Sequence, residues 1–237
     1  LDGVFSHTGS DSRYFNREGR YGDGGAYRDP NSPYRSWYDF DPKYKGGYRS
    51  WWGFETLPEV NEENPSYVEF ITGEGGVIDT WLRRGAAGFR LDVADELPDD
   101  FIEKIRAAVK RVSPEKFLLG EVWEDATTKY GFGQRRTYLL GKGLDSVMNY
   151  PFKNAVLDFV KGKPAEQAMG EILSICEHYP APAMDTALNF LSTHDTERAL
   201  TVIADEPANG RGREWQSGRC VTGEAYEEGM LRLRMAY

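Results

Sequence analysis

Asp92, Glu121 and Asp195 each stand at the end of a run of apolar residues, and the three runs lie far apart in the chain. Two carboxyl groups held roughly 5 Å apart can break a glycosidic bond with retention, one as nucleophile and one as proton donor. A third fixed negative charge would stabilise the cationic character that develops on the sugar ring. These residue types therefore indicate nucleophilic and acid–base chemistry on a carbohydrate.

Arg90 stands two residues before Asp92, inside the alternating stretch Gly88–Glu96. Residues two apart project from the same face of a β-strand, so the guanidinium can keep Asp92 ionised and oriented. A buried strand with Arg and Asp on one face is costly unless that face has a role. A purely structural ion pair explains the same two residues, and this stretch alone does not choose between the two interpretations.

The acids are expected at the ends of strands that alternate with helices. Such alternation predicts a parallel sheet with both faces covered. In an α/β barrel the carboxyl ends of the strands surround one mouth, where active sites lie, so we expect Asp92, Glu121 and Asp195 to reach one pocket. The expected strands cover 88–96, 117–124, 144–149 and 187–195. The expected helices cover 64–84, 98–112, 151–161 and 165–179. The tail 196–237 is expected to be loop and then helix.

The segment from Thr8 to about Pro58 has almost no helical periodicity and is dense in Gly, Tyr, Trp, Asp and Pro. So long an irregular stretch inside a compact fold is usually functional. Tyr48, Trp51 and Trp52 offer flat apolar faces for stacking on sugar rings. The alternative is that these aromatic side chains form the core of the segment itself.

Size and charge limit the classes of function. A chain of 237 residues is long enough for one α/β barrel or for two ordinary domains. The net charge of −9 offers no broad basic surface, so a nucleic-acid partner is not expected. No apolar run is long enough to span a bilayer, so we expect no membrane association and a cytoplasmic location, although a signal peptide could precede Leu1. Cys176 and Cys220 are expected to be reduced thiols.

Four segments together resemble the ordered sequence signatures of the α-amylase superfamily of glycoside hydrolases, glycoside hydrolase family 13. They are Asp2–His7, Gly88–Glu96, Gly120–Glu124 and Ser192–Asp195. The segment Leu57–Asn61 is similar to the additional motif of that superfamily. Five motifs in the right order make a specific resemblance, and it covers the chain nearly from end to end.

The resemblance implies a (β/α)8 barrel with an irregular domain inserted after the third strand. Residues 1–7 would be the end of the third strand, 8–58 the inserted domain B, and 59–237 the rest of the barrel, from the third helix to the seventh. The first two strands would precede Leu1 and the eighth would follow Tyr237. We therefore expect an incomplete barrel, a fragment of a longer enzyme that is poorly active alone.

The resemblance also implies a role for each matching residue. Asp92 would be the nucleophile, Glu121 the general acid/base, and Asp195 the carboxylate that helps to distort the sugar and stabilise the transition state. Arg90 would orient Asp92, and Asp2 would brace the site from beneath. The other implied substrate-binding residues are His7, Asn61, Asp95, Glu96, Trp123 and His194, together with Trp51 and Trp52, whereas His178 lies in no motif and is expected to have a packing or surface role.

The stretch Val93-Ala94-Asp95-Glu96 resembles the Val-Ala-Asn-Glu form of the neopullulanase, cyclomaltodextrinase and amylopullulanase branch. Members of that branch cleave α-1,4 bonds, often α-1,6 bonds too, and some transfer glycosyl groups. Asp95 replaces the usual Asn, which bears on the acceptor side. Ser6 and Glu96 stand where many relatives carry an Asn and a His that bind calcium. We therefore expect no required cofactor, with calcium possible but its usual site altered.

The expected function is hydrolysis of α-1,4, and also α-1,6, glucosidic bonds of starch-derived oligosaccharides through a covalent glycosyl-enzyme, with transglycosylation as a further outcome. An α-glucan is the expected partner, and the oligomeric state is left open. One alternative is a non-catalytic carbohydrate-binding or interaction barrel, or an inactive fragment. Another is a metal-dependent barrel enzyme whose carboxylates bind magnesium, which the order and context of the motifs disfavour.

Overall fold

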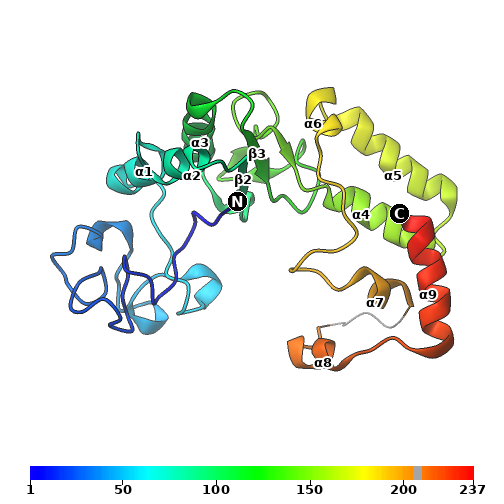
Figure 1. Ribbon diagram of the computed structural model, residues 1–237, viewed down its shortest axis with the longest axis horizontal. Helices are drawn as coiled ribbons and strands as arrows, with labels where there is room; N and C mark the ends of the chain where they lie inside the picture. The colour runs from blue at the N-terminus through cyan, green and yellow to red at the C-terminus, as the bar shows by residue number, and fades with distance from the viewer. Residues whose placement is uncertain (205–209) are drawn as a thin grey trace. The chain divides into compact units, whose positions relative to one another are not determined.

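Residues 1–204 and 210–237 are described by a computed structural model, in which the chain divides into two units. The first unit contains Leu1–Glu121 and Thr128–Ser146, and the second contains Val122–Thr127 and Val147–Tyr237. Figure 1 colours the chain from blue at the N-terminus to red at the C-terminus. No helix of the described residues is both long and apolar enough to cross a membrane.

A parallel sheet forms the centre of the first unit. Strand β2 (Gly88–Leu91) lies between β1 (Asp2–Gly3) and β3 (Phe117–Gly120) and pairs in parallel with both. The sheet order β1-β2-β3-β6 ends with β6 (Ser146–Val147), whose first residue is the last of this unit. The predicted parallel sheet is thus confirmed, with strands shorter than the apolar runs suggested.

Two helices occupy the region where the sequence predicted one. Helix α1 (Pro65–Thr72) and helix α2 (Val77–Arg83) are separated by Gly73–Gly76. Gly75 has φ +73, a left-handed backbone that a helix cannot contain. The Asn64 side chain caps α1 by accepting from the first backbone N–H groups. The prediction of a helix over 64–84 was therefore wrong in its middle.

Helix α3 (Asp99–Val112) packs beside the sheet through a continuous apolar face. Asp145 ties this helix to β3, because its carboxylate accepts from Arg106 Nη1 and Lys110 Nζ at 2.7 Å and from the Leu118 backbone N–H at 2.8 Å. Burial alone would raise the pKa of Asp145, but the bonds from Lys110 and Arg106 lower it below its usual value. Charge as well as packing therefore fixes the strand that precedes Glu121.

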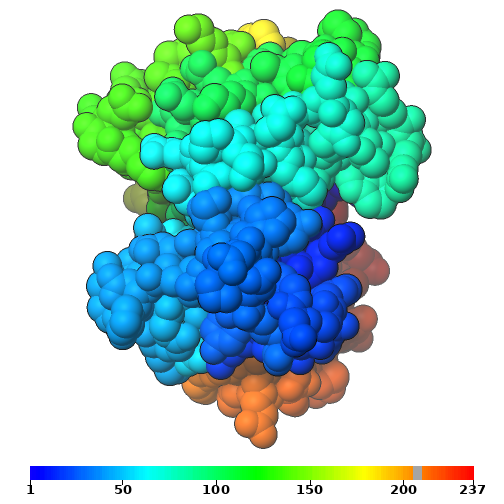
Figure 2. All heavy atoms as spheres, turned by 90° about the vertical axis from the view of Figure 1, so that its left-hand side faces the viewer, coloured from blue at the N-terminus to red at the C-terminus, as the bar shows by residue number. Residues whose placement is uncertain are grey.

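The segment from Thr8 to Pro58 is irregular, as predicted. It contains only the short turns η1 (Arg35–Trp37), η2 (Lys45–Gly47) and η3 (Trp51–Gly53). Aromatic rings form its core, and Figure 2 shows the segment in blue as one continuous surface. Tyr48 is fully buried and donates to the Glu55 carbonyl, so of the two alternatives for Tyr48 the structure supports a place in the core of the segment.

The second unit is mainly helical. Helix α4 packs against α5 and α9, and α7 packs against α9 (Figure 1). Leu157, Leu191 and Ile203 belong to the core between these helices. The described helices of this unit are α4 (Tyr150–Val160), α5 (Ala165–His178), α6 (Ala181–Asp185), α7 (Ala199–Ala204), α8 (Arg213–Gly218) and α9 (Gly223–Ala236). Residues 205–209 of the predicted tail lie outside the described residues.

The predicted strand over 187–195 was wrong. Leu188 makes a single parallel bridge to Met148, and the residues from 189 to 195 have no regular pairing. The reason is that the partner segment ends at once: Asn149 accepts from the Phe152 N–H and caps α4. A strand that loses its partner after one residue has no ladder to join. The two cysteines are free and exposed, as expected.

Candidate active site

Arg90 is the centre of a charged cluster at the carboxyl ends of β1, β2 and β3. Its Nη1 lies 2.7 Å from Asp2 Oδ1 and 2.7 Å from Asp92 Oδ1, and its Nη2 lies 3.0 Å from Glu121 Oε2. The strand register explains this, because Asp2 pairs with Arg90, and Leu91 pairs with Gly120, the residue before Glu121. Three strands therefore deliver three carboxylates to one guanidinium.

The charges of this cluster are coupled. Burial alone would lower the pKa of Arg90, but its bonds and charge interactions with Asp2, Glu121 and Asp92 raise that pKa above its usual value. Arg90 therefore stays a cation and holds Asp92 and Glu121 on the same planar group. This arrangement is compatible with the roughly 5 Å separation of carboxyl groups in retaining glycosidases.

Glu121 is nearly fully buried, at 4% exposed. Its Oε2 accepts from the Val93 backbone N–H at 2.7 Å and faces Arg90 Nη2. The backbone hydrogen bond and the ion pair with Arg90 both involve Oε2, so this oxygen is fixed in position. The Glu121 carboxyl group is therefore held in one orientation beside Asp92.

Val93 has φ 42 and ψ 53, a left-handed backbone that is an outlier for a β-branched residue. Its N–H donates to Glu121, and its carbonyl accepts from the Glu96 N–H at 2.8 Å. Strain of this kind persists only where surrounding contacts impose it. Here it turns the chain sharply after Asp92 into η4 (Ala94–Glu96) and aims one more backbone donor at Glu121.

Glu96 fixes two tryptophans of the irregular segment. Its Oε2 accepts from the Trp51 indole N–H at 2.5 Å, and its Oε1 accepts from the Trp52 indole N–H at 2.8 Å. The two indole rings stack with centroids 5.5 Å apart. Trp52 is nevertheless 76% exposed, so a broad apolar face is held still and open to solvent. Three predicted substrate-binding residues are therefore brought together.

His7 lies within the same group of residues. Its ring centroid is 5.4 Å from that of Trp51, and its Nδ1 is 2.9 Å from Ser6 Oγ. Burial lowers the pKa of His7, and the nearby charges of Asp92 and Glu96 oppose this only in part. The lowered pKa favours the neutral imidazole, and because Nδ1 bonds to Ser6, Nε2 is the ring nitrogen that could face a sugar hydroxyl group.

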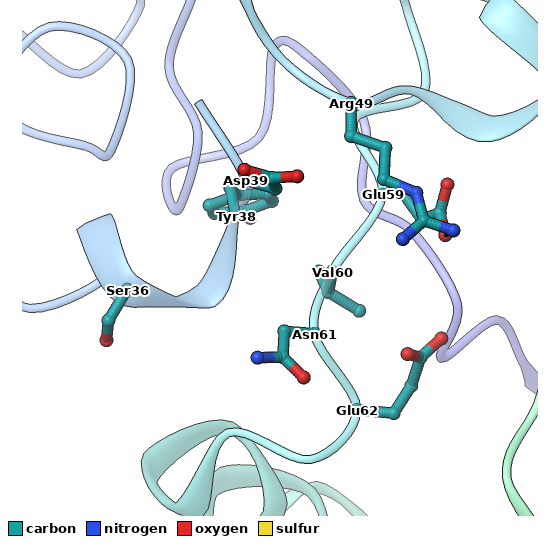
Figure 3. Close-up of a pocket in the computed structure, with 8 residues that line it drawn as sticks. All are labelled: Ser36, Tyr38, Asp39, Arg49, Glu59, Val60, Asn61 and Glu62. Atoms are coloured by element: carbon teal, nitrogen blue, oxygen red, sulfur yellow. Dashed lines mark ion pairs between the residues drawn. The ribbon is translucent and has the colours of Figure 1, made fainter. Parts of the chain in front are cut away.

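The segment Leu57–Asn61 runs antiparallel to the residues around His7. Glu59 bridges to His7, and the Val60 N–H donates to the Ser6 carbonyl at 3.0 Å. Beside it lies a cavity of about 410 Å³, in which Arg49 pairs with Glu59 (Figure 3). Asn61 lines this cavity, although its Oδ1 accepts from the Glu63 N–H and so also supports the local turn.

Glu62 lines the same cavity and was not singled out from the sequence. Burial raises the pKa of Glu62 to about 8, with smaller contributions from neighbouring charges. A folded-state pKa above the unfolded value of 4.5 means that the unfolded chain releases this proton first. The contribution of Glu62 to stability is therefore fully present below about pH 4.5 and is lost as the pH rises through about 8.

Glu62→Gln is expected to remove this pH dependence. The thermal midpoint of the variant relative to the parent should rise between about pH 5 and about pH 9, by about 2–4 °C for each kcal/mol recovered. Thermal unfolding followed by circular dichroism in the two buffers is the measurement. Glu63→Gln, at an exposed neighbour, is the control. Equal midpoint differences for Glu62→Gln at both pH values would contradict the assignment.

A second cavity, the groove, has a volume of about 590 Å³ and lies over η4. Its lining includes Trp51, Trp52, Asp95 and Glu96, to which the sequence analysis assigned substrate binding. Phe132, which the sequence analysis did not single out, also lines it. Phe132 lies in the turn of a hairpin formed by β4 (Tyr130–Gly131) and β5 (Gln134–Arg135). The available signal was a glycine at 133 between residues of strand type.

Three predicted site residues belong to the second unit. Trp123 stacks on Tyr150 with ring centroids 4.3 Å apart and is 41% exposed. His194 Nε2 lies 3.0 Å from Asp195 Oδ2. The convergence of Asp195 with Asp92 and Glu121 therefore stays a prediction. His178 has a structural partner, since its Nδ1 lies 2.6 Å from Asp125 Oδ2.

The side chains at the two altered calcium positions bond to other side chains. The Ser6 hydroxyl group bonds to the His7 ring, and both carboxylate oxygens of Glu96 accept from indole N–H groups. Across residues 1–204 and 210–237, no cluster of three or more His, Cys, Asp or Glu side chains could hold a metal ion. That the usual calcium site is altered stays a prediction.

A comparison with protein families decides the classification. The family described as "Alpha amylase, catalytic domain" matches residues 1–217. The chain belongs to the α-amylase family. The predicted family and its (β/α)8 fold class are thus confirmed. The roles assigned to Arg90 and Asp92 stay predictions.

Known members of the family resemble the chain over most of its length. An amylopullulanase of Thermoanaerobacterium saccharolyticum is 36% identical over 88% of the chain and 18% of that protein. A cyclomaltodextrinase of a Bacillus species is 33% identical over 85% of the chain and 34% of that protein. The chain therefore spans about a fifth to a third of the length of these two relatives.

Two solved structures of glycan hydrolases also resemble the chain. The type III pullulan hydrolase of Thermococcus kodakarensis is matched with a TM-score of 0.75 and 26% identity, over 99% of the chain and 37% of that protein. The cyclic α-maltosyl-(1→6)-maltose hydrolase of Arthrobacter globiformis is matched with a TM-score of 0.73 and 26% identity, over 86% of the chain and 44% of that protein.

Arg90→Lys is expected to lower kcat/KM on α-glucans by about 10²-fold or more, although it keeps the charge. An ammonium group cannot hold Asp2, Asp92 and Glu121 in the fixed geometry of a guanidinium. Steady-state kinetics of the full-length protein is the measurement, with Arg213→Lys, at an exposed position, as the control. Parent-like kinetics for Arg90→Lys would show that the cluster is only structural.

Proposed function

We propose that the full-length protein containing this chain hydrolyses α-glucans with retention of configuration at the anomeric carbon. The observation that carries the proposal is the single guanidinium of Arg90 shared by Asp92 and Glu121 at the ends of adjacent parallel strands. Asp92 is thereby oriented as the nucleophile, and Glu121 is held beside it as the proton donor. Membership of the α-amylase family supports this assignment of roles.

In the first step the Asp92 carboxylate attacks the anomeric carbon of the bound sugar, and a C–O bond to Asp92 forms. The glycosidic C–O bond breaks, and Glu121 gives its proton to the leaving oxygen. In the second step Glu121 takes a proton from water, and the resulting oxygen attacks the anomeric carbon and releases Asp92. A sugar hydroxyl group in place of water would give transglycosylation.

Asp195 and the two histidines have supporting roles in this proposal. Asp195 would supply fixed negative charge where the ring carbon becomes cationic. His194, whose ring lies against the Asp195 carboxylate, and the neutral His7 would bind hydroxyl groups of the sugar being cleaved. Asp2 accepts from the same nitrogen of Arg90 as Asp92 does, and would fix the guanidinium and so keep the nucleophile in place.

The proposed bonds are α-1,4 glucosidic bonds, with α-1,6 bonds in addition. Relatives named amylopullulanase and cyclomaltodextrinase support this choice of substrates. The test is product analysis of the full-length protein on maltotriose, pullulan and a cyclodextrin. Cleavage of all three is expected, and cleavage of maltotriose alone would contradict the placement within this branch. Location in the cytoplasm and the absence of a required cofactor remain predictions of the same proposal.

A further inference from the structure

We propose that Phe132 is a substrate-binding residue that forms the second aromatic wall of the groove, with Trp52 as the first, and holds one sugar ring of an α-glucan. This inference rests on the proposed function, because it assigns a sugar to the groove. It adds a residue that lies in none of the sequence motifs of the family. The evidence comes from the composition of the groove, the backbone of Phe132 and the anchoring of its hairpin.

The composition of the groove suits a neutral sugar. A volume of about 590 Å³ is within the range of small-ligand pockets. Trp52 and Phe132 offer apolar faces for the C–H side of a sugar ring. Each carboxylate oxygen of Asp95 and Glu96 already has one partner and keeps a second lone pair that can accept from a hydroxyl group. The acidic residues of the lining outnumber its one cation, Arg49, so an anionic ligand is disfavoured.

Both aromatic walls are open to solvent. Phe132 is 61% exposed and Trp52 is 76% exposed, although each lines the same cavity. Exposed aromatic rings that share a groove are a feature of binding sites rather than of a stable surface. The Trp52 indole N–H donates to Glu96, which keeps the ring in position, so this wall is preorganised for a ligand.

The backbone of Phe132 argues that its side chain was selected for a purpose other than the turn. Gly131 pairs with Gln134, so Phe132 and Gly133 form a two-residue turn, with φ 51 and φ 77. Positive φ at both positions is typical of a type I′ turn, in which Asn-Gly is preferred and a bulky residue is unfavourable. Trp52 has φ 50 and is under the same constraint.

Arg136 anchors the hairpin to the turn that carries Glu96. Its fully buried guanidinium lies 2.8 Å from Asp99 Oδ1 and donates to the Asp95 carbonyl at 2.8 Å and the Leu97 carbonyl at 2.6 Å. The carbon at the centre of the same guanidinium lies 5.2 Å from the centroid of the Phe132 ring. The ring is therefore backed by a rigid group, which lowers the entropy lost on binding.

The experiment measures binding without turnover. Glu121→Gln in the full-length protein serves as the parent, and maltotetraose is titrated into it by calorimetry. Phe132→Ala is expected to weaken binding by about 3- to 10-fold, the effect of losing one aromatic contact. Phe132→Trp should bind maltotetraose with the affinity of the parent, since an indole also offers a flat apolar face.

Phe132→Asn separates binding from folding. Asparagine suits the first position of a type I′ turn, so the thermal midpoint should stay the same or rise, while binding of maltotetraose weakens as in Phe132→Ala. Tyr130→Ala is the matched control, because Tyr130 lies on the same hairpin, is 73% exposed and does not line the groove.

Parent-like affinity of Phe132→Ala and Phe132→Asn would overturn the inference, as would equal weakening by Tyr130→Ala. Trp52→Ala distinguishes the two walls. If Trp52→Ala weakens maltotetraose binding and the Phe132 variants do not, only Trp52 contacts the sugar and the inference about Phe132 is wrong. Failure of the proposed function has a different signature. In that case the protein with both Phe132 and Glu121 intact would cleave no α-glucan at all.

Discussion

Asp92→Asn in the full-length protein is expected to lower kcat on maltotriose by at least about 10⁴-fold. The amide cannot form the covalent bond to the anomeric carbon on which both steps depend. Affinity for maltotriose should change little, because asparagine has the same size and its oxygen can still accept from Arg90 Nη1, which lies 2.7 Å from Asp92 Oδ1. Sugar release and calorimetric titration measure the two effects separately.

The matched control is Asp100→Asn, which makes the same chemical change on the exposed first turn of α3. It should leave both kcat and affinity unaltered. A kcat within about tenfold of the parent for Asp92→Asn would sink the proposed reaction. Binding of maltotriose together with no hydrolysis by the parent would instead favour a carbohydrate-binding module.

Glu121→Gln is expected to lower kcat on maltotriose by about 10²- to 10⁴-fold, the usual contribution of a general acid. The loss should be far smaller in the first step with α-maltosyl fluoride, since fluoride departs without a proton. Glutamine can still accept from the Val93 N–H, so the turn after Asp92 is expected to keep its conformation. Rates with the two substrates, measured side by side, test the role of acid directly.

Glu115→Gln, at an exposed position between α3 and β3, is the control for the loss of one negative charge. Equal losses of Glu121→Gln on both substrates would contradict proton donation by Glu121. They would assign that carboxyl group to positioning Arg90, through the 3.0 Å contact between Oε2 and Nη2. The Asp92→Asn and Glu121→Gln pair thus separates the nucleophile from the acid.

The placement of charged side chains at the strand ends was predictable because it depends on short-range spacing. Two residues apart on a strand means one face, so Arg90 and Asp92 could be placed together from the sequence, and their 2.7 Å contact confirms it. The apolar residues of α3 recur with the period of a helix, so the sequence predicted this helix with nearly correct ends. The family motifs then supplied roles that no local pattern contains.

Other features depend on partners that local sequence does not specify. Residues 187–195 have the alternation of a strand, but Asn149 ends the partner segment by capping α4. Tyr48 and Trp52 are both aromatic residues of the irregular segment. Tyr48 is nevertheless fully buried, whereas Trp52 is 76% exposed. Phe132 was missed because its turn lacks the usual Asn-Gly pair.

The pairing of Asp2 with Arg90 and of Leu91 with Gly120 has a consequence for how the gene can change. Adding or deleting one codon inside either strand would turn the side chains of the cluster around Arg90 to the opposite face. The irregular segment from Thr8 to Pro58 begins only after β1 has ended, so a change in its length leaves this register unaltered. We therefore expect insertions and deletions to be tolerated in the connections that follow the strands and not inside the strands.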